Sequence, residues 1–86
     1  MPTVARIGNL AILFFYNDHG APHFHVVGPD FTAKILMADF SLLSCTGKIR
    51  NADLRVIQDW GQKHRDSLLL NWHRARADEP LEKIED

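Results

Sequence analysis

Residues 3–16, TVARIGNLAILFFY, indicate most clearly how the chain begins to fold. The two runs of β-branched, aliphatic and aromatic residues flank Gly8 and Asn9, and a glycine–asparagine pair in that position is typical of a two-residue hairpin turn. We therefore expect strands at residues 3–7 and 10–16. The second run is apolar on both faces, which predicts a central strand that is covered on both sides by a helix, the C-terminal tail or a partner.

Outward from this hairpin, the chain continues with three short β-prone segments, HFHVV at 23–27, FTAKILMA at 31–38 and SLLSC at 41–45. Turn-forming residues, such as the GPD that follows the first of them, separate these segments. The connections are too short for the helical crossovers of a parallel sheet. Residues 1–47 are therefore expected to form an antiparallel meander of about five strands.

From Asn51 the apolar residues recur with the period of a helix. Asn51 is a suitable N-cap, and Asp53 lies in the first turn, where the helix dipole favours a negative charge. Gly61 lies inside the helical window and the polar residues 63–65 follow it, which favours two helices that break there over one kinked helix. We expect an α+β fold in which two C-terminal helices, within residues 51–77, pack on the meander.

The 86 residues are enough for a single domain and too few for two. Hydrophobic residues make up 45% and charged residues 24% of the chain, as in a folded globular protein. Cys45 is the single cysteine and cannot form an internal disulfide, and the N-terminus lacks the order of a signal peptide, so we expect a cytoplasmic protein. No apolar run approaches the roughly twenty residues that cross a bilayer, so we expect no membrane association.

Charge is distributed unevenly along the chain. Residues 1–77 carry nine lysines and arginines against six acidic residues, a net +3, whereas residues 78–86 carry a net −4. We expect this acidic tail to be a solvated end, with docking on its own domain or on a partner as alternatives.

Lys48, Arg50 and Arg55 form a basic patch at the junction of sheet and helix. With a helix dipole this patch is a candidate phosphate site, although scattered basic residues more often only solvate a surface. The net charge of +3 over residues 1–77 is low for a protein that binds RNA nonspecifically. Nucleic acid therefore stays open as a partner without being favoured.

The segment NDHGAPHFHV, residues 17–26, holds three of the five histidines. On a strand, His23 and His25 lie on one face, and His19 on the preceding turn is expected to fold back over that face. Three imidazoles and a water are the open coordination of a catalytic divalent metal such as zinc. A structural site would add a fourth protein ligand such as Asp18, Asp39 or Cys45.

The same segment allows two interpretations without a metal. Two strand histidines are suited to general acid and base work in phosphoryl transfer on RNA, with Tyr16, Lys34 or Arg6 stabilising the developing negative charge. Alternatively, Asn17 and Asp18 bind nearby backbone amides of the turn, and the histidines are polar residues on a half-exposed sheet. A metal site, an acid–base site and a structural or interface role all remain alternatives.

The pattern as a whole resembles a family. The start MPTVARIGNLAILFFYNDHGAPHFHV is similar to MPTI.RI.G..I.F..NDH.PPHFHV of the small prokaryotic family known as domain of unknown function 4160, and VIQDWGQKHRDSLLLNWHRARADEP resembles its W...H...L...W......P half. The residues that match the first motif are Asn17, Asp18, His19, Pro22, His23, Phe24 and His25. Trp60, His64 and Trp72 match the second. Ala21 replaces the usual proline and removes no ligand or catalytic group.

The resemblance implies membership of two-gene modules that are suspected toxin–antitoxin components, and hence a protein partner. We expect a binding or regulatory module of such a system, with a histidine-rich loop as its site. The expected binding residues are Asn17, Asp18, Lys48, Arg50 and Arg55.

The alternative is a small hydrolase, above all a nuclease, that uses His19, His23 and His25 as metal ligands or as acid and base. The sequence leaves open whether the protein is an enzyme. A domain of this size has little room for a pocket, and the apolar strand at 10–16 offers an interface. Both features favour a homodimer or a protein partner.

Overall fold

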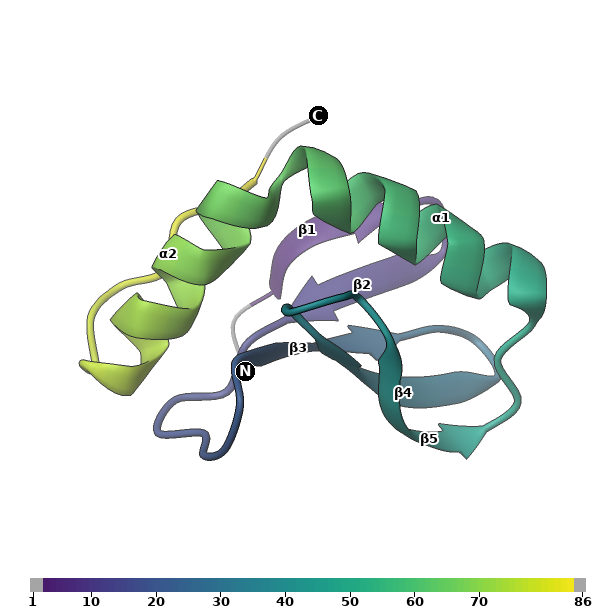
Figure 1. Cartoon of the computed structure of the whole chain (residues 1–86), viewed down its shortest axis with the longest axis horizontal. Helices are drawn as coiled ribbons and strands as arrows, with labels where there is room; N and C mark the ends of the chain where they lie inside the picture. The colour runs from purple at the N-terminus through teal and green to yellow at the C-terminus, as the bar shows by residue number, and fades with distance from the viewer. Residues whose placement is uncertain (1–2, 85–86) are drawn as a thin grey trace.

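The computed structural model describes residues 3–84 and consists of a five-stranded antiparallel sheet followed by two helices (Figure 1). The elements are β1 (Thr3–Ile7), β2 (Leu10–Leu13), β3 (His23–Val27), β4 (Phe31–Leu36), β5 (Leu42–Gly47), α1 (Asn51–Lys63) and α2 (Arg65–Arg76). The strands lie in the sheet in chain order, and each is antiparallel to its neighbours. The α+β meander predicted from the sequence is confirmed.

The predicted hairpin joins β1 and β2. Gly8 adopts φ +57° in its turn, and Ile7 pairs with Leu10 across it. The second strand is shorter than expected, since β2 ends at residue 13 and the chain turns toward α2. There Asn17 takes φ +60° and donates its backbone N–H to the carbonyl of Ala75 at 3.3 Å. Small shifts also occur further on, since β4 ends at residue 36 rather than 38 and β5 covers 42–47 rather than 41–45.

The two helices meet at His64, within the predicted break. Its backbone angles, φ −114° and ψ 23°, lie outside the helical range. The prediction of Asn51 as N-cap is wrong, because Asn51 is already the first helical residue and Arg50 is the cap. The Arg50 guanidinium donates to the Asp53 carboxylate at 3.2 and 3.3 Å. This ion pair stabilises the first turn of α1 in place of a hydrogen bond from a backbone amide to an N-cap side chain.

The core lies between one face of the sheet and the two helices (Figure 1). Phe24 and Ile35 are fully buried on the sheet side, and Ile57 of α1 and Leu68 of α2 are fully buried opposite them. Burial of each such side chain is worth about 1.5–3 kcal/mol. On the other face, Leu13 is only 4% exposed, so the end of β2 is covered on both sides, as predicted, within this chain alone.

The acidic tail packs back on its own domain, contrary to the expectation of a solvated end. Leu81 and Ile84 are half-buried against the core, and the Ile84 amide donates to the Val4 carbonyl of β1 at 2.8 Å. The side chains of Asp78, Glu79 and Glu82 stay exposed, while Leu81 and Ile84 turn inward. Glu85 and Asp86 belong to the predicted tail but lie outside the described residues.

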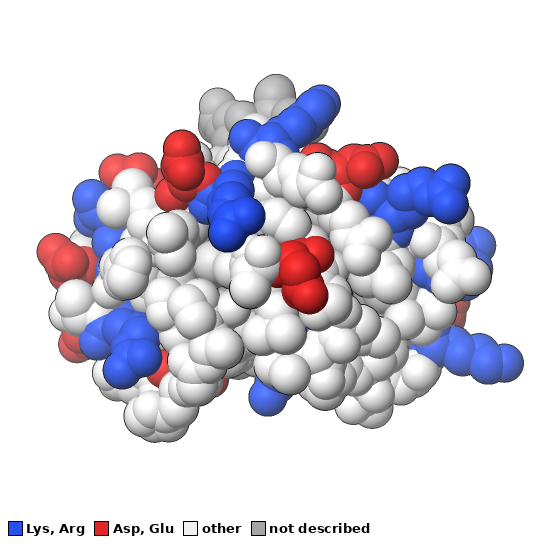
Figure 2. Space-filling view, in the orientation of Figure 1, with Lys and Arg blue, Asp and Glu red and all other residues white. Residues whose placement is uncertain are grey.

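Two surface features bear on the predicted partners. On the face seen in Figure 2, basic and acidic side chains are interspersed rather than gathered by sign. Within residues 3–84, no helix has the length and apolar character needed to span a bilayer.

Candidate metal site

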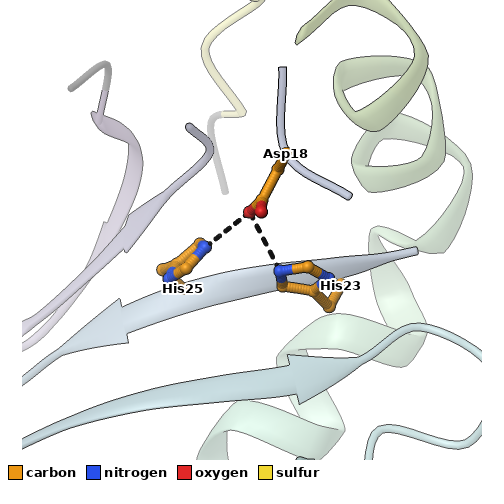
Figure 3. Close-up of side chains that lie close together, drawn as sticks. All are labelled: Asp18, His23 and His25. Carbon is orange, nitrogen blue, oxygen red and sulfur yellow. Dashed lines mark hydrogen bonds and ion pairs between the residues drawn. The ribbon is translucent and has the colours of Figure 1, made fainter. Parts of the chain in front are cut away.

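The loop between β2 and β3 carries Asp18, the acidic residue of the candidate site. The positive φ of Asn17 and Gly20 bends this loop, and the hydrogen bond from Asn17 to Ala75 ties its start to the end of α2. Asparagine and glycine adopt such angles at the lowest cost. The bend places Asp18 above the start of β3, where its carboxylate points at the strand (Figure 3).

Two histidines of β3 meet this carboxylate. His23 and His25 are two residues apart and therefore lie on the same face of the strand, as the alternation predicted. The Nε2 atoms of both rings lie 2.9 Å from Oδ2 of Asp18 (Figure 3). The residues are 3% and 8% exposed, so both imidazoles are nearly withdrawn from water.

The hydrogen bonds of the two rings differ. Nδ1 of His23 lies 2.8 Å from the carbonyl oxygen of Ala21, which can only accept, so Nδ1 carries a proton. In the neutral ring Nε2 of His23 then bears a lone pair, and this buried atom has no hydrogen-bond partner although Asp18 is close. Nε2 of His25, by contrast, donates to Oδ2 of Asp18.

The surroundings lower the pKa values of two residues of the site, His25 and Asp18. Burial lowers the pKa of His25 below its usual 6.5, and the hydrogen bond and negative charge of Asp18, which would raise it, do not compensate. Burial alone would raise the pKa of Asp18. Hydrogen bonds from His25 and from the His19 amide, together with the charges of His23 and His25, have the larger effect and lower this pKa below 3.8. At neutral pH the carboxylate is therefore charged and His25 is neutral.

Aromatic side chains hold the two rings in place. The Phe15 ring packs edge-on against His25 with centroids 4.2 Å apart, and the Trp72 ring of α2 lies 5.1 Å from that of His23. These contacts restrict both imidazoles to orientations in which Nε2 faces the carboxylate. No spacing in the chain indicates that α2 reaches the start of β3, so the contact of Trp72 with His23 could not be predicted from the sequence.

Asp18, His23 and His25 can supply one ligand atom each to a metal ion, and these atoms all lie within 4.8 Å of one another. Two imidazoles and one carboxylate are ligands for zinc and other divalent transition metals. The hydrogen bond from His23 Nδ1 to a backbone carbonyl is the contact that commonly orients a metal-bound imidazole. Three protein ligands leave at least one coordination position for water or a substrate.

The other predicted ligands lie apart from this group. The His19 side chain is exposed, and only its backbone amide joins the site, by donating to Oδ1 of Asp18 at 3.0 Å. Asp39 lies in the exposed turn after β4, where it accepts the Ser41 amide. Cys45 of β5 packs against the core. Within the part of the chain that the structure describes, Asp18 takes the place that the sequence analysis gave to His19.

The predicted basic patch is remote from the histidines. Lys48, Arg50 and Arg55 are exposed between β5 and the first turns of α1. Arg50 borders a cavity together with Asp30 and Phe31, which are near the end of β3, whereas the histidine site is at its start. The guanidinium of Arg50 is already bonded to Asp53. The basic patch and the histidine site are therefore two separate regions.

A comparison with known families adds a further finding. The family described as Domain of unknown function (DUF4160) matches residues 10–73, which include all three members of the site and Trp72. The chain belongs to this family. As a DUF4160 protein it carries β2 to β5, α1 and most of α2 within the matched region, while β1 and the docked tail lie outside it. No curated protein and no solved structure is significantly similar to the chain.

Proposed function

We propose that this DUF4160 protein is a metal-binding module, in which Asp18, His23 and His25 hold one divalent transition-metal ion such as zinc. The observation that carries the proposal is the state of His23. Its Nδ1 is bound to a carbonyl, and its buried Nε2 faces a carboxylate oxygen at 2.9 Å without a hydrogen bond.

A lone pair on a buried imidazole that faces a carboxylate is unfavourable unless a cation lies between them. A proton on Nε2 is one solution, and it makes His23 an imidazolium. A divalent ion is the stronger solution because it accepts the His23 lone pair, the carboxylate and, once Nε2 loses its proton, His25 together. Asp18 is already charged at pH 7, as a metal needs, and His25 is neutral, so that only the proton on its Nε2 has to leave before this nitrogen binds a metal.

The wider role that we propose is regulatory binding within a two-protein prokaryotic system. Both histidines are buried, so a bound ion is shielded from a large substrate and is retained by the protein. This favours a binding role over catalysis on a large substrate. A hydrolase, including a nuclease, is the second proposal. Its support is the Asp18 side chain, which is 23% exposed and leaves one side of the site within reach of solvent. A substrate phosphate would have to enter from that side.

The direct test is metal analysis of the untagged protein after it is incubated with zinc and dialysed. The wild type should retain about one zinc per chain, as expected for one site with three protein ligands. His23→Ala and Asp18→Asn should each lose it, because removal of a ligand weakens binding more than the 10–100-fold that is usual for loss of an outer partner.

Two histidine variants serve as matched controls. His19→Ala and His73→Ala each remove one exposed imidazole outside the group and should retain full zinc. If the wild type takes up no metal, or if His19→Ala loses it as completely as His23→Ala, the proposed site is wrong. Zinc bound to both mutant and wild-type proteins would point to adventitious surface binding.

A further inference from the structure

Strand β5 is an edge of the sheet whose outer side is unpaired. It bonds only to β4 within the described chain, and its sequence, LLSCTG, contains neither a charge nor a proline. Natural edge strands usually carry such residues, because a free row of backbone donors and acceptors invites another strand. The opposite edge, β1, is partly covered by the tail through the bond from Ile84 to Val4.

Apolar surface lies along the same edge. Leu42 is 37% exposed and Leu43 is 49% exposed. Leu43 is the extra residue of a bulge, since Lys34 pairs with Ser44 and Ile35 with Leu42. From residue 44 to residue 47 the pairing with β4 is regular, so four residues present an even outer edge.

The charges that flank β5 indicate which strand fits it. Asp39 lies before the strand and Lys48 directly after it, and both are exposed. Neither side chain forms an ion pair within residues 3–84. If β5 pairs with another β5 in antiparallel fashion about its middle, Lys48 of each copy comes opposite Leu42 of the other, toward the end that carries Asp39, whereas parallel pairing would bring like charges together.

We propose that β5 pairs with β5 of a second copy of this chain about a two-fold axis near Cys45. The two sheets would then form one continuous antiparallel sheet, and the paired edges would cover each other's free backbone groups. The metal site is on β3, two strands away from this edge, so pairing does not depend on metal occupancy.

The test compares the association of two lysine variants by sedimentation equilibrium of the full chain. Thr46 is exposed on β5 beside the proposed axis, and its cross-strand partner Thr32 is exposed on β4, one strand inward. Thr46→Lys places two like charges diagonally across the axis on the free edge, so the dissociation constant of the dimer should rise at least about tenfold over that of the wild type. Thr32→Lys adds the same charge away from the edge and should leave the constant within about twofold.

Two further measurements define the pairing direction. Near a two-fold axis, antiparallel residues have Cα atoms about 4.5–5.5 Å apart, which suits a disulfide. Mild oxidation should therefore link two chains through Cys45, and Thr46→Lys should reduce the yield. Lys48→Glu should also weaken the dimer, because it places the new carboxylate beside the Asp39 end of the other copy.

A chain that stays monomeric at all concentrations from about 5 to about 500 µM would overturn the proposal. So would a dimer that Thr32→Lys weakens as much as Thr46→Lys does, because another face would then form the interface. A monomer whose β5 binds a strand of a different protein would equally refute self-pairing.

Discussion

At the scale of single residues, the orientation of His23 follows from one backbone carbonyl. Ala21 accepts its Nδ1 proton, so the opposite nitrogen is turned toward Asp18. Sequence alternation is sufficient to place His23 and His25 on one face. The position of Asp18 could not be predicted in the same way, because it depends on a loop bend that is tied to Ala75, far away in the chain.

The titration of His25 gives a prediction about stability in acid. Its pKa in the folded protein is below the usual 6.5, so between these values the unfolded chain binds more protons than the folded one. The contribution is fully present above about pH 6.5 and is lost as pH falls toward the folded pKa. For the metal-free protein, the free energy of unfolding should therefore decrease from about pH 7.5 to about pH 5.5.

Chemical denaturation across that range, with a chelator present, measures the slope. His25→Asn removes the titrating group and should therefore reduce the slope of the free energy of unfolding against pH. For a single proton the reduction is at most about 1.4 kcal/mol per pH unit. Equal slopes for the wild type and His25→Asn would contradict the assignment.

Asn71 gives a second prediction at this scale. The residue is fully buried, and its side-chain amide donates to the Glu82 carbonyl at 2.9 Å and accepts the Glu82 amide at 2.8 Å. Asn71→Leu leaves both backbone groups without these bonds and should lower the free energy of unfolding by about 1–3 kcal/mol. Gln62→Leu, an exposed change on α1, is the control for added hydrophobicity. An unchanged Asn71→Leu protein would mean that the tail is not held by this contact.

At the scale of elements, the strands follow from their patterns, but their ends do not. The Gly8 turn fixed the first hairpin in the prediction, and the polar residues around His64 located the break between the helices. The early end of β2 is set by the contact of its loop with α2, which no local pattern contains. The start of α1 was misplaced by one residue because Arg50, which no cap preference favours, pairs with Asp53.

The packing of α1 predicts the effect of a substitution at Gly61. A Cβ there would lie 2.6 Å from the ring of Phe40, and Phe40 is held at φ +58° with its carbonyl bound by Gln58. Gly61→Ala gains about 1 kcal/mol in helix propensity but overpacks the core, which costs about 1–3 kcal/mol. We expect a net loss of stability on thermal denaturation. The neighbouring exposed change Gln62→Ala should alter stability by no more than about 0.5 kcal/mol, and a Gly61→Ala variant more stable than the wild type would contradict this packing.

At the scale of the whole molecule, the tail closes the domain. The sequence indicated its charge, but charge alone favoured a solvated end. The tail docks because two apolar residues lie between the acidic ones. Leu81 and Ile84 pack against the core, and the Ile84 amide donates to β1. Their partners are distant in sequence, so composition could not show the docking.

Truncation after residue 77 tests this closure. The shortened chain loses the burial of Leu81 and Ile84 and uncovers the edge of β1. We expect a lower Tm together with self-association through β1, since an uncovered edge attracts other strands. A variant with Glu79, Glu82 and Lys83 changed to serine keeps the apolar residues and should stay close to the wild type. A truncated protein with unchanged Tm would show that the tail adds nothing to the fold.

Whether Asp18, His23 and His25 bind one metal ion can be measured by anomalous diffraction at the zinc edge from crystals grown with zinc. We expect one strong peak about 2.0–2.2 Å from His23 Nε2, His25 Nε2 and a carboxylate oxygen of Asp18. Zinc found only at exposed histidines such as His73, with His23 Nε2 still directed at Asp18 and no ion between them, would contradict the proposed site.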